Sequence, residues 1–120
     1  MKIDHLAIWV KDIELMRQFY LKYFDTTSGE KYFNPIQEFT SYFISFNEGG
    51  CRIELMHSPD IADIPGKRGS AMGNAHFAIT VGSKNAVNDL TELLRKDGYI
   101  IESEPRTSGD GYYESAVLDP

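Results

Sequence analysis

Apolar residues alternate with polar or small ones in two short segments that nearly repeat each other. The segments are His5–Val10 (HLAIWV) and His76–Val81 (HFAITV), which are offset by 71 residues and share four of six residues. Alternation with a period of two is typical of a β-strand with one buried face. Each segment is therefore predicted to be a strand whose histidine lies on the face opposite its large apolar residues.

A helical pattern follows each predicted strand, as expected for helices that cover one face of a sheet. The first apolar stripe is Ile13, Met16, Phe19, Tyr20 and Tyr23, and the second is Val87, Leu90, Leu93 and Leu94. Asp12 and Ser83 precede these stripes and have side chains suited to N-caps. Gly98 is placed to end the second helix.

Further alternating segments complete a repeated plan. The first helix is followed by predicted strands at 27–33, 39–47 and 51–57, and the second by strands at 99–105 and 112–118. The repeat predicts an α+β fold of two βαβββ modules within a single domain at 1–120. Module one covers about 1–58, a linker about 59–74, and module two about 75–120. The second module lacks its last strand here, because the counterpart of 51–57 would begin beyond residue 120.

Composition excludes several classes of function. The 120 residues carry 12 Lys and Arg against 18 Asp and Glu, a formal net charge of −6, which disfavours generic binding to nucleic acid or anionic lipid. No apolar run reaches the roughly 20 residues of a membrane span, and the first residues lack the apolar block of a secretion signal. The single cysteine, Cys51, cannot form an internal disulfide and is expected on the buried face of its strand. We therefore expect a cytoplasmic protein with no nucleic-acid or membrane partner.

Three residues are candidate metal ligands, because strand alternation places them on the same kind of face. His5 and His76 occupy equivalent positions in the repeated strands, and Glu54 lies opposite the apolar Ile53 and Leu55. If a pseudo-twofold axis relates the modules, equivalent strands meet at its centre. Two imidazoles and a carboxylate suit a divalent transition metal and leave coordination positions open. Symmetry places a fourth ligand at position 125, beyond this sequence.

Glu114 is a second candidate acid. Its counterpart at the repeat offset is Phe43, in a segment whose core-facing residues include Tyr42 and Ile44. Alternation turns Phe43 and, by analogy, Glu114 toward the predicted cavity. Glu114 is a candidate metal ligand, general base or binder of a polar substrate group, and the sequence leaves these roles open.

These features resemble the vicinal oxygen chelate superfamily, which includes glyoxalase I, bleomycin resistance proteins, fosfomycin resistance enzymes and extradiol dioxygenases. The resemblance covers nearly the whole chain and rests on the order of short motifs: His5-Leu6-Ala7-Ile8, Arg52-Ile53-Glu54-Leu55-Met56, His76-Phe77-Ala78-Ile79 and Val117-Leu118-Asp119-Pro120. It implies that His5, Glu54 and His76 bind a divalent metal ion (Zn, Ni, Mn or Fe). It also implies a homodimer.

The resemblance further implies a metal-dependent lyase or isomerase of the glyoxalase I (lactoylglutathione lyase) type. Such an enzyme acts through an enediolate on a small oxygenated substrate, such as the hemithioacetal of methylglyoxal and a thiol. Glu54 would be a ligand, and Glu114 or the acid beyond residue 120 would shuttle the proton. Another enzyme of the superfamily (a thiol transferase that confers antibiotic resistance, an epimerase or a dioxygenase) is an alternative. A metal-free protein that sequesters a small molecule is a further alternative, which the retained His, Glu, His set disfavours.

Overall fold

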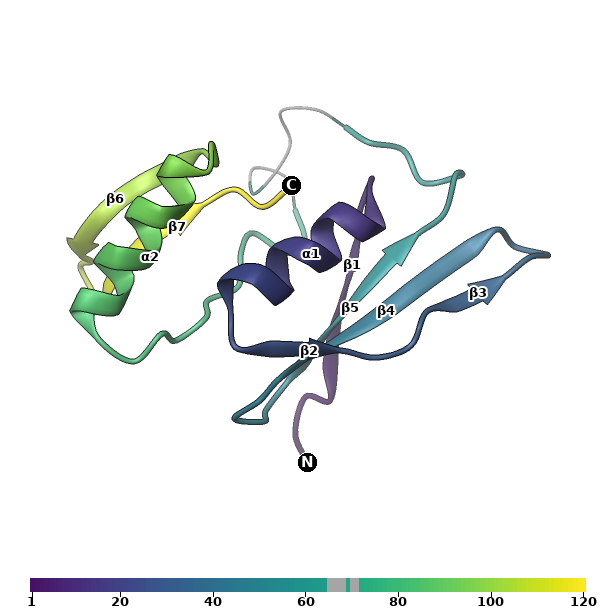
Figure 1. Ribbon diagram of the computed structural model, residues 1–120, viewed down its shortest axis with the longest axis horizontal. Helices are drawn as coiled ribbons and strands as arrows, with labels where there is room; N and C mark the ends of the chain where they lie inside the picture. The colour runs from purple at the N-terminus through teal and green to yellow at the C-terminus, as the bar shows by residue number, and fades with distance from the viewer. Residues whose placement is uncertain (65–68, 70–71) are drawn as a thin grey trace. The chain divides into compact units, whose positions relative to one another are not determined.

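The computed structural model describes residues 1–64, 69 and 72–120, and the chain divides into two compact units. Unit 1 comprises Met1–Ile64 with Pro120, and unit 2 comprises Pro65–Asp119. Each unit combines one helix with a sheet, so the α+β class predicted from the sequence is confirmed (Figure 1). Part of the predicted linker, residues 65–68, 70 and 71, lies outside the described residues. No helix within the described ranges is long and apolar enough to cross a membrane.

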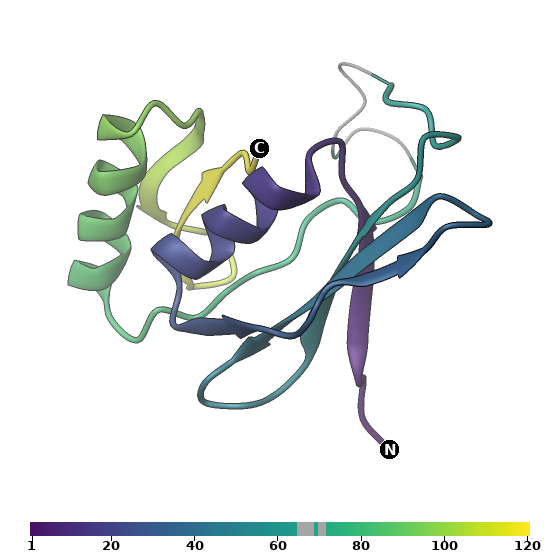
Figure 2. The ribbon, with the colours of Figure 1, turned by 45° about the vertical axis from the view of Figure 1, so that its right-hand side comes forward.

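Unit 1 contains a five-stranded sheet and one helix. In chain order the elements are β1 (His5–Trp9), α1 (Ile13–Tyr23), β2 (Thr26–Ser28), β3 (Tyr32–Asn34), β4 (Phe39–Phe46) and β5 (Arg52–His57). The strands are ordered β1-β5-β4-β2, and β3 also pairs with β4. β1 runs parallel to β5, and the other pairs are antiparallel. α1 crosses one face of this sheet (Figures 1 and 2).

The core of unit 1 lies between α1 and the sheet. The side chain of Asp12 caps the helix by accepting a hydrogen bond from Leu15 N at 2.9 Å, as predicted. All five residues of the predicted apolar stripe are buried. The helix contacts β2, β4 and β5, whose buried residues include Tyr42, Ile44, Ile53 and Leu55. The opposite face of the sheet is therefore left for polar and aromatic side chains.

The single strand predicted at 27–33 is wrong, because two strands occupy this region. β2 pairs with residues 44–46 of β4, and β3 pairs with residues 39–41. Residues 29–31 then lie opposite only two residues of β4, so that one extra residue interrupts the ladder, as in a β-bulge. Gly29 N still donates to Phe43 O at 2.8 Å. The alternation of side chains in the sequence does not reveal such an extra residue. A bulge changes which backbone groups pair, and it requires no particular type of residue.

Unit 2 contains α2 (Lys84–Lys96) and a two-stranded sheet of β6 (Ile101–Thr107) and β7 (Tyr113–Val117). The helix contacts both strands. The side chain of Ser83 caps α2 by accepting a hydrogen bond from Ala86 N at 3.1 Å. Gly98 follows the helix with a φ of +91°, the left-handed conformation that glycine adopts readily at a helix C-terminus. The predicted beginning and end of this helix are both confirmed.

The strand predicted at 76–81 does not form, although these residues are described. In unit 1 the repeated segment pairs with β5, and the counterpart of β5 would fall at 123–128, beyond residue 120. The side chains nevertheless keep the alternation of a strand. Phe77, Ile79 and Val81 are half-buried, whereas His76, Ala78 and Thr80 are exposed. The residue pattern sets which way side chains face, but a strand also needs a backbone partner.

Candidate metal centre

Two of the predicted ligands meet on the face of the unit 1 sheet opposite α1. His5 lies on β1 and Glu54 lies on β5. In the register of the two strands, Glu54 lies opposite Ala7, which follows His5 by two residues. His5 Nε2 is 3.6 Å from Glu54 Oε2. The side chains of His5 and Glu54 are 39% and 16% exposed, respectively, so that the pair is reachable from solvent. Both residues lie on the face that strand alternation predicted.

The chemistry and spacing of this pair fit two ligands of one divalent ion. Imidazole nitrogen and carboxylate oxygen bind zinc at about 2.0–2.2 Å, which places two tetrahedral ligands about 3.3 Å apart. The observed separation of 3.6 Å is close to this value. Among the described residues, no group of three or more His, Cys, Asp or Glu is arranged to hold a metal. The pair can therefore supply part of a ligand set.

Three neighbours complete what we term the His5 cluster (Asp4, His5, Phe43, Arg52 and Glu54). Asp4 Oδ2 accepts hydrogen bonds from His5 Nδ1, at 3.0 Å, and from Arg52 Nη2. The Arg52 guanidinium lies 4.4 Å from the centre of the Phe43 ring. The rings of Phe43 and His5 pack edge-to-face with centroids 5.2 Å apart. The imidazole is thus held by a hydrogen bond at one nitrogen and by an aromatic ring beside it.

The electrostatics of the cluster make its open nitrogen suitable for a cation. Hydrogen bonds from His5 and then from Arg52 lower the pKa of Asp4. An ionised carboxylate can only accept hydrogen bonds, so that His5 Nδ1 carries a hydrogen, and a neutral ring then keeps its lone pair at Nε2. This lone pair and the Glu54 carboxylate face each other beyond hydrogen-bond distance. Two electron-rich groups in this arrangement favour a positive charge between them.

The other two predicted site residues belong to unit 2. His76 is exposed in the segment that forms no strand. Glu114 lies on β7 between Tyr113 and Ser115, whose side chains bond to α2, so that Glu114 faces away from the helix as alternation predicted. Its side chain is half-exposed, and its Oε1 lies 3.6 Å from Arg106 Nη1. The sharing of one ion by His5, Glu54 and His76 stays a prediction.

Asp4 and Arg52 were not among the residues predicted for the site. Asp4 directly precedes His5, and Arg52 lies two residues before Glu54, which places it on the same face of β5. Their opposite charges, each within two residues of a predicted ligand in the sequence, were the signal that could have identified them. The expectation of a buried Cys51 is wrong, because its thiol is exposed. Cys51 precedes the first paired residue of β5, so that the alternation of the strand does not determine its burial.

Solved structures of glyoxalase I share this fold. A glyoxalase I mutant from Zea mays has a TM-score of 0.76 and 22% identity, covering 99% of this chain and 41% of that chain. The trypanothione-dependent glyoxalase I of Leishmania major has a TM-score of 0.72 and 20% identity. The match covers 100% of this chain and 80% of that chain. This chain therefore spans about two fifths of the Zea mays protein.

A fosfomycin resistance protein has the same fold. The Listeria monocytogenes protein was solved with Mn(II) and 1S,2S-dihydroxypropylphosphonic acid. Its TM-score is 0.68 at 17% identity, covering 98% of this chain and 82% of that chain. No curated protein matches this chain in sequence. The profile of the Glyoxalase/Bleomycin resistance protein/Dioxygenase superfamily, in contrast, matches residues 2–120. The resemblance seen in the motifs is thereby confirmed, and the chain belongs to the glyoxalase/bleomycin resistance protein/dioxygenase superfamily.

Proposed function

We propose that this chain is a metal-dependent enzyme of the glyoxalase I type. It would move a proton between adjacent carbons of a small oxygenated substrate, such as the hemithioacetal of methylglyoxal and a thiol. The observation that carries this proposal is the pair of electron-rich groups, His5 Nε2 and Glu54 Oε2, which face each other at 3.6 Å on a solvent-accessible sheet face. A protein that only sequesters an organic molecule has no need of such a pair.

In this proposal His5 and Glu54 hold the ion, and His76 is the third ligand. A bound divalent ion supplies Lewis-acid polarisation of neighbouring substrate oxygens, which lowers the cost of negative charge on them. Imidazole and carboxylate ligands are compatible with Zn, Ni, Mn or Fe. The proposal includes a cytoplasmic homodimer, for which the family resemblance and the lone cysteine are the support.

Glu114 is the proposed acid–base residue. Its carboxylate would accept a proton from one substrate carbon and return it to the next. The side chain is half-exposed, and its 3.6 Å separation from Arg106 is longer than a hydrogen bond. Its oxygens therefore stay accessible to a substrate. The direction of Glu114 away from α2 matches that of Glu54 away from α1, which supports a role on the same kind of sheet face.

The metal and the reaction can be tested together on the full chain. Elemental analysis after incubation with Zn, Ni, Mn or Fe should find bound metal, and turnover of methylglyoxal with a thiol should depend on it. His5→Ala and Glu54→Gln should each weaken metal binding by about 100-fold or more, since loss of an outer partner alone costs 10–100-fold. The matched controls are His57→Ala and Glu48→Gln. His57 lies on β5 with its Nδ1 3.0 Å from Val10 O, and Glu48 is exposed in a turn.

Fosfomycin resistance is the second candidate, because the Listeria protein shares the fold over 82% of its length. Opening of the fosfomycin epoxide by the metal-loaded chain, by a thiol to give a thioether or by water to give a diol, without turnover of methylglyoxal, would favour this candidate. A wild-type chain that binds none of the four metals would overturn both enzyme proposals. Equal metal binding by wild type, His5→Ala and Glu54→Gln would overturn the assigned ligands.

A further inference from the structure

We infer that Asp4 is a positioning residue of the proposed metal centre, which fixes the tautomer and direction of His5 so that Nε2 is offered to the ion. Arg52 holds Asp4 in this role. The inference rests on the proposed function, and it adds residues outside the predicted ligand set. Its support comes from the backbone, the side-chain contacts and the hydrogen-bond chemistry of the His5 cluster.

The backbone of Asp4 is anchored to β5. Its carbonyl accepts a hydrogen bond from Arg52 N at 3.0 Å, which extends the pairing of β1 and β5 by one residue before His5. The Asp4 side chain is 64% exposed, yet this bond limits where it can point. A substitution at Asp4 leaves the backbone bond available, so that the carboxylate can be tested without removing the end of the strand pair.

One carboxylate oxygen of Asp4 serves two donors. Oδ2 accepts from His5 Nδ1 at 3.0 Å and from Arg52 Nη2. Arg52 is itself placed over the Phe43 ring at 4.4 Å, a stacking arrangement that its planar guanidinium favours. The carboxylate is therefore not a freely rotating surface group, because an arginine fixed on an aromatic ring defines its position.

This arrangement determines which nitrogen of His5 can bind a metal. Since the Asp4 carboxylate accepts from Nδ1, the neutral ring presents its lone pair at Nε2, toward Glu54 3.6 Å away. Without the carboxylate, the ring would also populate the other tautomer, which carries a hydrogen at Nε2 and cannot bind metal there. Partners of this kind orient metal-bound histidines and change metal affinity by about 10–100-fold.

The tautomer can be measured in the metal-free full chain at neutral pH by ¹⁵N NMR of the histidine rings. In wild type, His5 should show the hydrogen at Nδ1. Asp4→Ala should shift the ring toward the Nε2–H form, and Asp4→Asn, whose amide oxygen also accepts a hydrogen bond, should restore the Nδ1–H form. The matched control is Asp63→Ala. Asp63 is 63% exposed and pairs with Lys11 at 4.0 Å, so that it resembles Asp4 in exposure and in having a cationic partner.

Zinc titration against a competing chelator provides the second measurement. Asp4→Ala should bind about 10–100-fold more weakly than wild type, Asp4→Asn should recover part of this loss, and Asp63→Ala should match wild type. An Asp4→Ala chain that keeps both the Nδ1–H tautomer and wild-type affinity would overturn the inference while leaving the metal centre intact. A wild-type chain that binds no zinc or other divalent ion would instead overturn the proposed function. In that case the tautomer comparison would still test the orientation of His5.

Discussion

The two units follow related sequence patterns but bury very different surfaces. In unit 1, α1 buries five apolar or aromatic residues, and Ile44 and Leu55 beneath it have no exposed surface. In unit 2, α2 buries Thr91 and Leu94, while Leu93 of the predicted stripe is exposed. α1 has a five-stranded sheet to cover and α2 has two strands. An apolar stripe on a helix therefore becomes a buried core only where enough strands lie beneath the helix to cover it.

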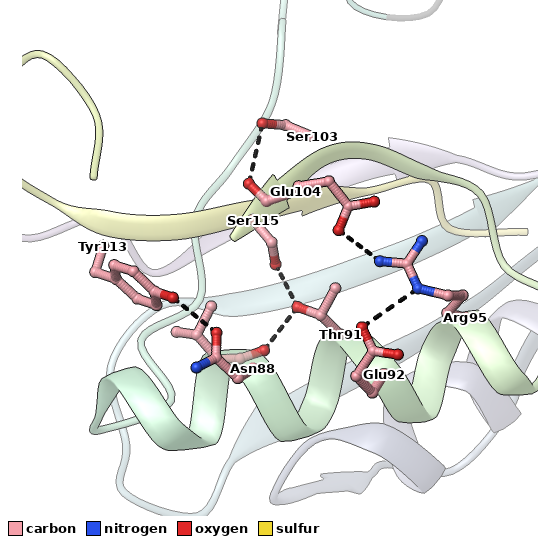
Figure 3. A network of polar contacts seen from close by, with 9 residues as sticks. Asn88, Thr91, Glu92, Arg95, Ser103, Glu104, Tyr113 and Ser115 are labelled. Atoms are coloured by element: carbon pink, nitrogen blue, oxygen red, sulfur yellow. Dashed lines mark hydrogen bonds and ion pairs between the residues drawn. The ribbon is translucent and has the colours of Figure 1, made fainter. Parts of the chain in front are cut away.

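Polar contacts join α2 to its strands (Figure 3), whereas α1 buries more apolar residues than α2 does. The Thr91 and Ser115 hydroxyl oxygens are 2.7 Å apart and share a hydrogen bond. Tyr113 OH donates to Asn88 Oδ1 at 2.8 Å, and Arg95 donates to a glutamate of β6. Such bonds fix the register of helix and strands, but each adds less to stability than a buried large apolar side chain. We therefore expect unit 1 to contribute most of the chain's stability.

Truncation of a unit 1 core residue gives the largest expected effect. Leu55→Ala should lower the free energy of unfolding by about 2–5 kcal/mol, because it removes buried methyl groups and leaves a cavity. Urea denaturation followed by circular dichroism measures the change. Leu15→Ala, at an exposed position of α1, should change stability by less than about 0.5 kcal/mol. Comparable losses in the two variants would show that burial against the unit 1 sheet is not what stabilises the chain.

Local sequence rules predicted the helices well. Asp12, Ser83 and Gly98 mark helix ends through interactions within a few residues, and these do not depend on distant parts of the chain. Leu93 was predicted to face the core and is exposed, whereas Thr91 is buried instead. Which flank of a helix meets a sheet depends on the strands present, and residue spacing alone cannot supply that information.

The sequence predicted those features of the candidate site that depend on the alternation of side chains along a strand. The facing of His5 and Glu54 follows from the period of two, and their separation follows from β1 and β5 being neighbours. The joint role of His76 depends on long-range symmetry between two halves of the chain, which alternation does not determine. Asp4 was missed because it precedes β1, where no periodic pattern assigns it to a face.

Removal of one buried hydroxyl tests whether polar contacts stabilise unit 2. Thr91→Val keeps the shape of the side chain but deprives Ser115 of its partner, and should cost about 1–3 kcal/mol. The double variant Thr91→Val with Ser115→Ala should recover part of this loss, because no unpaired hydroxyl remains. Urea denaturation followed by NMR amide signals of α2 measures both. Thr107→Val, at an exposed position of β6, is the control. A cost no larger than that of the control would show that the hydroxyl pair contributes nothing.

The smallest expected effect comes from a polar contact at the edge of the unit 1 core. Glu14 Oε1 accepts from Lys31 Nζ at 2.8 Å and from Tyr42 OH at 2.9 Å. These hydrogen bonds, first from Lys31 and then from Tyr42, lower the pKa of Glu14. Because its pKa is lower in the folded state, ionised Glu14 stabilises the fold at pH values above the unfolded pKa of about 4.3. This stabilisation is lost as the pH falls through the folded pKa.

Glu14→Gln should therefore lower the free energy of unfolding at pH 7 by less than about 1 kcal/mol, since the contact is half-exposed. The gap from wild type should narrow between pH 7 and an acidic pH below the unfolded pKa of Glu14, because Glu14 becomes protonated in wild type as well. Urea denaturation at both pH values measures this, with Glu48→Gln in an exposed turn as the control. A gap of equal size at both pH values would show that the ionised carboxylate is not its source. The polar edge of unit 1 would then contribute through uncharged hydrogen bonds instead.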